Sequence, residues 1–332
     1  MNYLQLARRT SQFAIKINTV KGHGSWIMRH YSIEASTTGF WATLSNSTPV
    51  EYVQQGLVSL HDYSGLPWWA SIVVSTILVR SAVTLPLAIY QNKIVVRLEK
   101  IALEMPDIVK TLKAETALAI RKFHWSEEQA RMMYNHSLKK QWNNLVIREN
   151  CHPAKTMVVL WGQIPLWVFM SVAIRNMVYL LPDPSSIDAQ VTFAELTLGG
   201  FGWIPNLTVV DHSLILPVAM GLINFTIIEI QNAARTKEST KLQRILTNLF
   251  RGLCIVMVPV AATVPSCLCL YWVTSSACGL GQNLLLMSPR FKRLVGIPLV
   301  PSEIANPYRH IRNNFTGKYN FLLDKLRIGS KQ

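Results

Sequence analysis

The sequence lacks the short motifs that would assign it to a common enzyme class. No GxxxxGK[ST], HExxH or GxSxG pattern occurs among its 332 residues, which argues against a P-loop nucleotidase, a zinc peptidase and a serine hydrolase. Its five cysteines contain no CxxC pair, so neither a disulfide framework nor a zinc site is indicated. We therefore expect no enzymatic activity, no metal and no other cofactor.

Two long stretches of the chain lack positive charge. Residues 32–67 and 180–212 contain no Lys or Arg, although both contain acidic residues. The rest is so basic that the whole chain has a net charge of +15, while half of all residues are apolar. High apolar content together with high charge indicates separate blocks, with apolar blocks in lipid and charged blocks outside it.

Apolar runs that are long enough to cross a bilayer as helices recur along the sequence. They predict an all-α membrane protein with five transmembrane helices, at residues 68–90, 157–179, 213–232, 247–264 and 266–287. A small-molecule or ion carrier is an alternative, but it would be expected to show matching halves. The five unequal spans show no such repeat.

Lys and Arg fall on one side of the predicted membrane. If the spans alternate in direction, one side receives residues 91–156, residues 233–251 and the tail, with 12, 5 and 9 Lys or Arg. The other side receives the two stretches that have none. This asymmetry predicts an amino terminus outside and a carboxyl terminus inside. It also accounts for the net charge, so we expect contact with anionic lipid and no nucleic-acid partner.

The first 31 residues are typical of a mitochondrial presequence, because they contain five Lys or Arg and no acid. The motif Arg29-His30-Tyr31-Ser32 is similar to a processing site, with cleavage after Tyr31. Inside then means the mitochondrial matrix. Residues 32–67 are predicted to be a mostly irregular intermembrane-space segment with one short helix at 50–60. The five-span core covers residues 68–290, and a basic matrix tail covers residues 291–332.

The insert between the first two spans, residues 91–156, has the pattern of a helical hairpin. Ser126, followed by Gln129, has the spacing of a capping box that begins the second helix. Two apolar series have helical spacing: Ile94, Leu98, Ile101, Met105, Ile108 and Leu112, then Ala130, Tyr134, Leu138, Trp142 and Leu145. We expect an antiparallel hairpin on the matrix side. The pattern leaves open whether it packs only on itself or also contacts a substrate.

One charged residue lies near the middle of the first span. Arg80 is too far from both ends for its side chain to reach an interface easily, and a central arginine costs roughly 2.5–3.5 kcal/mol on insertion scales. A wet cavity and a structural salt bridge are the two explanations for such a residue, and no acid is predicted at mid-membrane depth. We therefore expect a cavity. Glu229, near the end of the third span, is expected either to lie at headgroup level or to pair with a matrix-side Lys or Arg.

Several stretches in order resemble the YidC/Oxa family of membrane protein insertases, over about residues 68–290. They are ILVRSAVTLPLAIYQNK, GQIPLWVFMSVAIRNM, GGFGWIPNLTVVDHSLILPVAMG and VPSCLCLYWVTSSACGLGQNLLL. The resemblance implies a hydrophilic groove around Arg80, with Gln163, Asn224 and Trp272 as further groove candidates. Interhelical hydrogen bonding is an alternative for Gln163 and Asn224, and packing is an alternative for Trp272.

The tail is short for this family, and prolines interrupt its helical pattern, so it offers no continuous ribosome-binding helix. In this respect the chain resembles the mitochondrial branch of the family that serves cytochrome c oxidase assembly. That resemblance implies a multi-pass protein of the inner membrane whose partners are newly made membrane proteins and oxidase assembly factors. It also implies export of the acidic carboxyl-terminal domain of oxidase subunit 2. A structural subunit of a respiratory complex is the alternative.

Overall fold

The computed structural model describes residues 40–235, 239–301 and 303–317. Within these ranges the chain is helical and contains no strand, only isolated β-bridges at Phe201–Ile204 and Val210–Pro265. The predicted all-α class is therefore confirmed. The predicted presequence, residues 1–31, lies outside the described residues.

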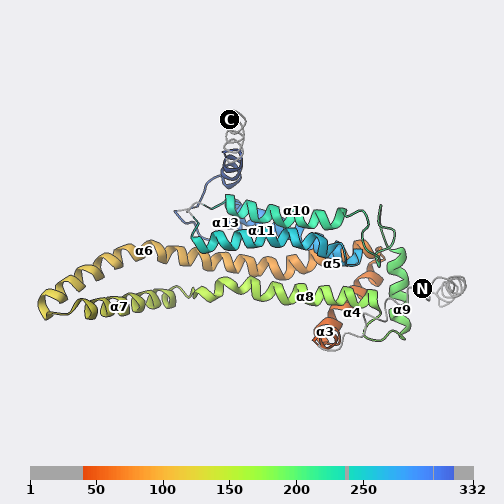
Figure 1. Cartoon of the computed structure of the whole chain (residues 1–332), viewed down its shortest axis with the longest axis horizontal. Coiled ribbons are helices and arrows are strands. Elements are labelled where there is room, and N and C mark those ends of the chain that lie inside the picture. The colour runs from red at the N-terminus through yellow and green to blue at the C-terminus, as the bar shows by residue number, and fades with distance from the viewer. Residues whose placement is uncertain (1–39, 236–238, 302, 318–332) are drawn as a thin grey trace, which may run out of the picture.

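Long helices run side by side along the molecule, and several shorter ones gather at one end (Figure 1). The elements are α3 (Phe40–Ser45), α4 (Thr48–Ser64), α5 (Trp68–Val79), a π-helical turn (Arg80–Thr84), α6 (Leu85–Phe123), α7 (Glu127–Arg148), a 3₁₀ turn (Pro153–Met157), α8 (Val158–Tyr179), α9 (Ile187–Leu198), α10 (Ile215–Ala233), α11 (Lys241–Ala261), α12 (Ser266–Met287) and α13 (Pro289–Leu294). A last helix covers residues 307–317.

Four helical stretches in the described chain are long and apolar enough to cross a membrane. They are Trp68–Phe123, Pro153–Tyr179, Ile215–Ala233 and Lys241–Ala261. The fifth predicted span corresponds to α12, which has 22 residues but carries Ser, Thr, Gln and Asn along its length. These polar residues explain why α12 is not among the four, although it packs against α5, α8 and α10.

The segment before the first span is more ordered than its sequence suggests. Residues 50–60 were expected to form a short helix in an irregular stretch, but α4 extends over 17 residues and packs on α8. Pro49 lies in the first turn of α4, where a missing N–H does no harm, and Gly65 ends the helix with a φ of 63°. Val50 and Leu57 are buried, so tertiary contacts stabilise the additional turns.

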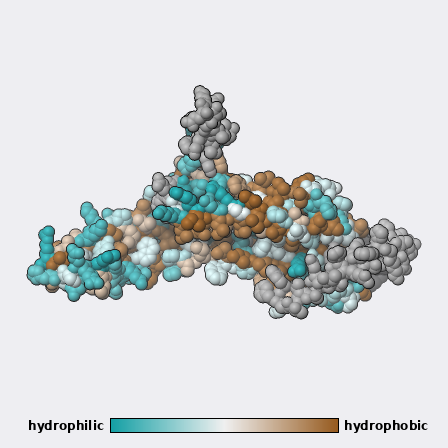
Figure 2. Space-filling model, in the orientation of Figure 1, coloured by the Kyte–Doolittle hydropathy of each residue, from teal (hydrophilic) through white to brown (hydrophobic). Residues whose placement is uncertain are grey.

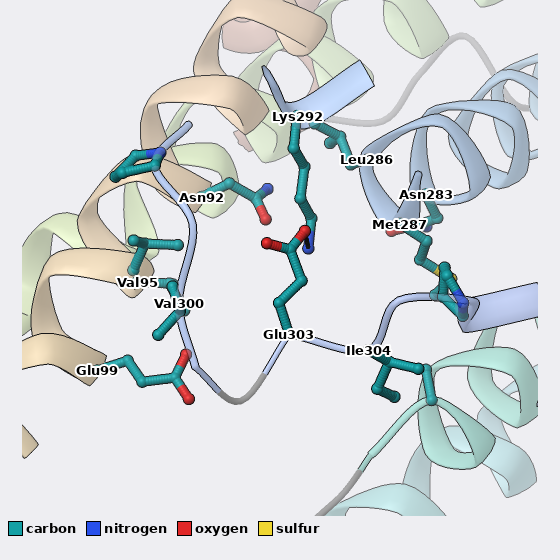
Figure 3. Close-up of a pocket in the computed structure, with 14 residues that line it drawn as sticks. Asn92, Val95, Glu99, Asn283, Leu286, Met287, Lys292, Val300, Glu303 and Ile304 are labelled. Atoms are coloured by element: carbon teal, nitrogen blue, oxygen red, sulfur yellow. Dashed lines mark ion pairs between the residues drawn. The ribbon is translucent and has the colours of Figure 1, made fainter. Parts of the chain in front are cut away.

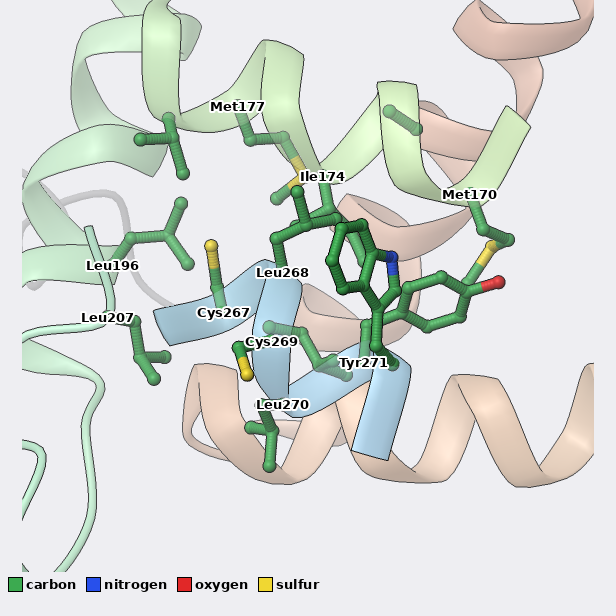
Figure 4. Packing of buried hydrophobic residues seen from close by; sticks show 14 of the residues in the cluster. Met170, Ile174, Met177, Leu196, Leu207, Cys267, Leu268, Cys269, Leu270 and Tyr271 are labelled. Carbon is green, nitrogen blue, oxygen red and sulfur yellow. The ribbon is translucent and has the colours of Figure 1, made fainter. Parts of the chain in front are cut away.

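The main core lies at the end of the molecule where α4 and α9 cover the bundle. Figure 4 shows side chains from α8 and α12 interleaved there with Leu196 and Leu207. Gly200 turns the chain at this end, and a Cβ on it would lie 2.0 Å from the carbonyl oxygen of Ile204. No residue other than glycine fits that turn, so the core and its loop are closely matched.

Helices α6 and α7 pack against each other at the opposite end of the molecule (Figure 1). Their contact surface is the predicted apolar seam, since Ile94, Ile101 and Leu145 are buried in one cluster to which Leu98, Met105, Ile108 and Trp142 also belong. Ser126 and Gln129 form the predicted capping box, with both reciprocal hydrogen bonds present. At about 1.5 Å per residue, the 39 residues of α6 extend roughly 58 Å, well beyond the membrane-spanning bundle.

Apolar side chains are exposed along α10 and α11, where Figure 2 shows a hydrophobic surface. The α6–α7 end is hydrophilic in the same view. Leu222, Leu249 and Ile255 are each more than 60% exposed, which in water would be unfavourable for so many neighbouring residues. These helices are therefore suited to contact with lipid.

Candidate functional site

Arg80 lies at the junction of α5 and α6, in a five-residue π-helical turn. Its backbone carbonyl accepts hydrogen bonds from the N–H of Leu85, from Oγ1 of Thr84 at 2.7 Å and from Nε2 of Gln282 on α12 at 2.9 Å. A π turn widens the helix locally and is often found at functional sites. The turn is thus held by side chains from two helices.

The guanidinium group of Arg80 is directed toward α12 and is only 9% exposed as a residue. Nε donates to Oγ of Ser275 at 3.1 Å, and Nη2 donates to the same hydroxyl. None of the ion pairs found among the described residues includes Arg80. A Cβ on Gly279 would lie 3.9 Å from Nη1, so a small residue faces the charge. The cation is therefore buried against a neutral hydroxyl rather than a carboxylate.

Trp272 lies on α12 and packs within the core. It is 8% exposed, its ring lies 5.6 Å from that of Trp167, and its Nε1 donates to Oγ of Ser171 at 3.1 Å. Both partners belong to α8, so Trp272 joins α12 to α8. Its geometry is that of a packing residue, and its predicted role in a groove remains a prediction.

Gln163 on α8 and Asn224 on α10 are partly exposed. Neither side chain makes a hydrogen bond within the described part of the chain, so the interhelical bonds considered for them are not formed there. The structure does not join either residue to Arg80. Both lie on helix stretches, residues 158–169 and 222–233, in which no side chain is fully buried.

Packing changes along the bundle at the level of Arg80. We call one part the packed half: residues 68–79 of α5, 170–179 of α8, 215–221 of α10 and 266–275 of α12, most of which are buried or nearly so. The other part is the loose half: residues 158–169 of α8, 222–233 of α10 and 276–287 of α12, among which only Leu286 is buried. Arg80 lies where the first gives way to the second, and Gln163 and Asn224 belong to the loose half.

Three residues around Arg80 are not among the candidates from the sequence: Ser275, Gln282 and Thr84. The sequence does contain a signal for the two residues on α12. Ser275, Gly279 and Gln282 are spaced by four and three residues and so share one face of that helix. The sequence shows this polar face but not that it meets the arginine. The pairing expected for Glu229 is confirmed, since its Oε1 lies 2.5 Å from Nη2 of Arg251 and ties α10 to α11.

Cys151 and Asp183, outside the membrane-spanning helices, have pKa values that are shifted from the ordinary ones. Burial raises the pKa of the Cys151 thiol, which lies at the base of the α6–α7 pair and stays protonated as a core residue. Hydrogen bonds from the side chain and backbone of Ser185 lower the pKa of Asp183. Neither shift points to a reactive group, and no cluster of three or more His, Cys, Asp or Glu among the described residues could hold a metal ion.

Comparison with known proteins identifies the architecture. The family model described as "60Kd inner membrane protein" matches residues 59–293. This chain belongs to that family, the YidC/Oxa1 insertases. The matched residues include all the helices around Arg80.

Individual relatives of this insertase chain come from mitochondria. It is 42% identical over 289 residues to the mouse cytochrome c oxidase assembly protein COX18, covering 87% of this chain and 86% of the relative. The human protein of the same name is 39% identical over 281 residues, with 85% and 83% covered. The Arabidopsis mitochondrial inner membrane protein OXA1 is 29% identical over 253 residues, covering 76% of this chain and 53% of the relative. With its apolar helices, the chain is a multi-pass protein of the mitochondrial inner membrane.

Proposed function

We propose that this insertase moves polar, acidic polypeptide from the matrix to the intermembrane space along a groove centred on Arg80. In this proposal the five membrane spans are residues 68–90, which comprise α5, the π turn and the start of α6, followed by α8, α10, α11 and α12. The amino terminus lies in the intermembrane space, and the α6–α7 hairpin and the carboxyl terminus lie in the matrix. Gln163 and Asn224 line the groove, and Trp272 braces its wall. The chain acts without catalytic chemistry or a cofactor.

The buried, carboxylate-free environment of Arg80 is the observation that carries the proposal. A guanidinium group in a low-dielectric setting attracts an acidic passenger more strongly than it would in water. Its position at the border of the packed and loose halves supports a cavity that begins at Arg80 and widens toward the hairpin. The packed half would then seal the membrane on the far side.

Two physical terms favour outward movement of an acidic segment. Water in the loose half would lower the desolvation penalty of polar backbone and side chains on part of their path. The membrane potential, negative in the matrix, contributes roughly 2.3 kcal/mol per exported negative charge for each 100 mV. With hydration of the groove and the membrane potential as driving forces, export needs no nucleotide hydrolysis.

We further propose that the passenger is the acidic carboxyl-terminal domain of cytochrome c oxidase subunit 2, and that oxidase assembly factors act with the chain. The support is the similarity to proteins named for oxidase assembly. Basic residues at the matrix ends of the spans would contact anionic headgroups.

The test is export of newly made subunit 2 in isolated mitochondria that carry Arg80→Ala. Export should fall by about tenfold or more, since the charge that meets the passenger is gone. Arg175→Ala is the matched control, because Arg175 is a cation on α8 that lies 5.2 Å from the Tyr179 ring and outside the proposed groove. Both variants must be present in the membrane at wild-type amounts.

Equal export by Arg80→Ala and the wild type would overturn the groove. If Arg80→Ala instead left export unchanged but reduced the amount of assembled oxidase, the chain would be a structural assembly subunit.

A further inference from the structure

The carboxyl-terminal segment folds back onto α6 and onto the ends of α10 and α12. We call residues 297–301 and 303–316 the clasp. Ile297 and Val300 are buried against Val96 of α6 and Leu286 of α12. Further along, the hydroxyl of Tyr308 donates to the carbonyl of Leu284 on α12 at 2.8 Å, and Nδ2 of Asn314 donates to the carbonyl of Ala233 on α10 at 2.8 Å.

A cavity of about 370 Å³ lies between the clasp, α6 and α12. It lies just beyond the end of the apolar run of the first span at Tyr90 and beside the last turn of α12. In a membrane this is the level of lipid headgroups. One wall is apolar, formed by side chains that include Val95, Leu286, Met287 and Ile304, and is suited to acyl chains and glycerol.

Glu303 of the clasp contributes the central polar group of this cavity (Figure 3). Its side chain is only 9% exposed. Oε2 pairs with Arg293, whereas Oε1 accepts no hydrogen bond within the described residues and lies 3.5 Å from Nζ of Lys292. Lys292 and Arg293 thus balance the charge of the carboxylate, but no hydrogen bond from the described residues reaches Oε1. This buried oxygen can therefore still accept a hydrogen bond from a ligand.

Asn92 of α6 supplies a second acceptor. Its Nδ2 donates to the carbonyl of Ala88 in the same helix at 2.8 Å, which leaves Oδ1 for another partner. Figure 3 shows Asn92 and Glu303 directed toward the same space, with Lys292 reaching into it from the opposite side. Oxygen acceptors of Asn92 and Glu303 and the ammonium of Lys292 therefore converge beside an apolar wall, and the carboxylate of Glu99 lines the same cavity.

We propose that this cavity binds a phospholipid with a primary ammonium headgroup, of the phosphatidylethanolamine class. The lipid ammonium donates to Oε1 of Glu303 and Oδ1 of Asn92, the phosphate lies toward Lys292, and the acyl chains follow the apolar wall. Phosphatidylcholine cannot donate a hydrogen bond from its quaternary ammonium. Cardiolipin has no ammonium that could donate to these two oxygens. This site is separate from the groove at Arg80 and does not depend on the export function.

The experiment measures lipid selectivity of the full chain purified in detergent. Native mass spectrometry is used to count phosphatidylethanolamine, phosphatidylcholine and cardiolipin bound from an equimolar mixture. The wild type should prefer phosphatidylethanolamine. Glu303→Gln and Asn92→Leu should each reduce that preference about tenfold, the effect of losing one hydrogen bond to a charged group.

Glu115→Gln is the matched control. It removes an exposed carboxylate from α6, the helix of Asn92, at a position outside the cavity. If Glu303→Gln fails to fold, Asn92→Leu decides alone, since the Asn92 amide bonds only within its own helix. The proposal is overturned if the wild type shows no preference, if it prefers cardiolipin at a site that Asn92→Leu abolishes, or if folded variants keep the full preference.

Discussion

The packed half and the loose half of the bundle share α8, α10 and α12, but these helices have different neighbours in each half. In the packed half, α4 and α9 cover the ends of α5, α8 and α12, and side chains there fill a continuous core. In the loose half the clasp covers the last turns of α10 and α12, but residues 158–169 and 222–233 contain no buried side chain. A helix long enough to span a membrane can thus seal along one part of its length and leave space along the other.

The strongest way to break the packed half is to add a single methyl group at its loop. Gly200→Ala should destabilise the protein by more than about 3 kcal/mol, because the new Cβ would collide with the backbone of Ile204. Gly281→Ala, in the loose half, has nothing within 4 Å of the added carbon and should be neutral or slightly stabilising. Thermal unfolding of both variants in detergent measures the difference, and similar unfolding curves would contradict it.

At the border between the halves, the stability of the protein should depend on the Ser275 hydroxyl that accepts hydrogen bonds from Arg80. Ser275→Ala removes the described acceptor of the Arg80 guanidinium and should lower the free energy of unfolding by about 1–3 kcal/mol. Ser276→Ala is the control, since this neighbouring hydroxyl makes no hydrogen bond in the described structure. A larger loss for Ser276→Ala than for Ser275→Ala would show that Arg80 is held in another way.

The two halves should also differ in how readily water reaches them, and this is the smallest of the expected effects. In a background without native cysteines, Gln163→Cys and Asn224→Cys should react with a hydrophilic maleimide at least about tenfold faster than Ala173→Cys, which replaces a side chain with 0% exposure. The measurement uses inner-membrane vesicles with the matrix face outward. Slow labelling at all three positions would mean that the loose half is filled by lipid instead of water.

Much of the architecture could be predicted because it follows from local patterns. The apolar runs, the seam of the α6–α7 hairpin and the capping box at Ser126 all depend on residues close in sequence. The pairing of Glu229 with a nearby cation was also foreseeable, because several Lys and Arg residues follow within about 22 positions of it in the chain. Predictions that depended on distant contacts fared less well. The segment before the first span forms α4 because Val50 and Leu57 reach the core.

The candidate site shows the same division. Arg80 is conspicuous in the sequence because a cation interrupts an apolar run. Its partner Ser275 lies 195 residues away, and no local pattern connects the two. The clasp was likewise hidden, since its prolines suggested an irregular tail and only the fold places Glu303 beside Lys292 and Asn92.

The sequence by itself determined that this chain is helical, that its apolar runs belong in a membrane, and that one guanidinium group must be accommodated among them, because hydropathy and charge are properties of each residue. Only the tertiary structure decided that a hydroxyl on α12 meets that guanidinium, that close packing ends at its level, and that the tail returns to form a polar cavity. These features depend on which helix faces meet, and that is determined by the packing of the whole bundle.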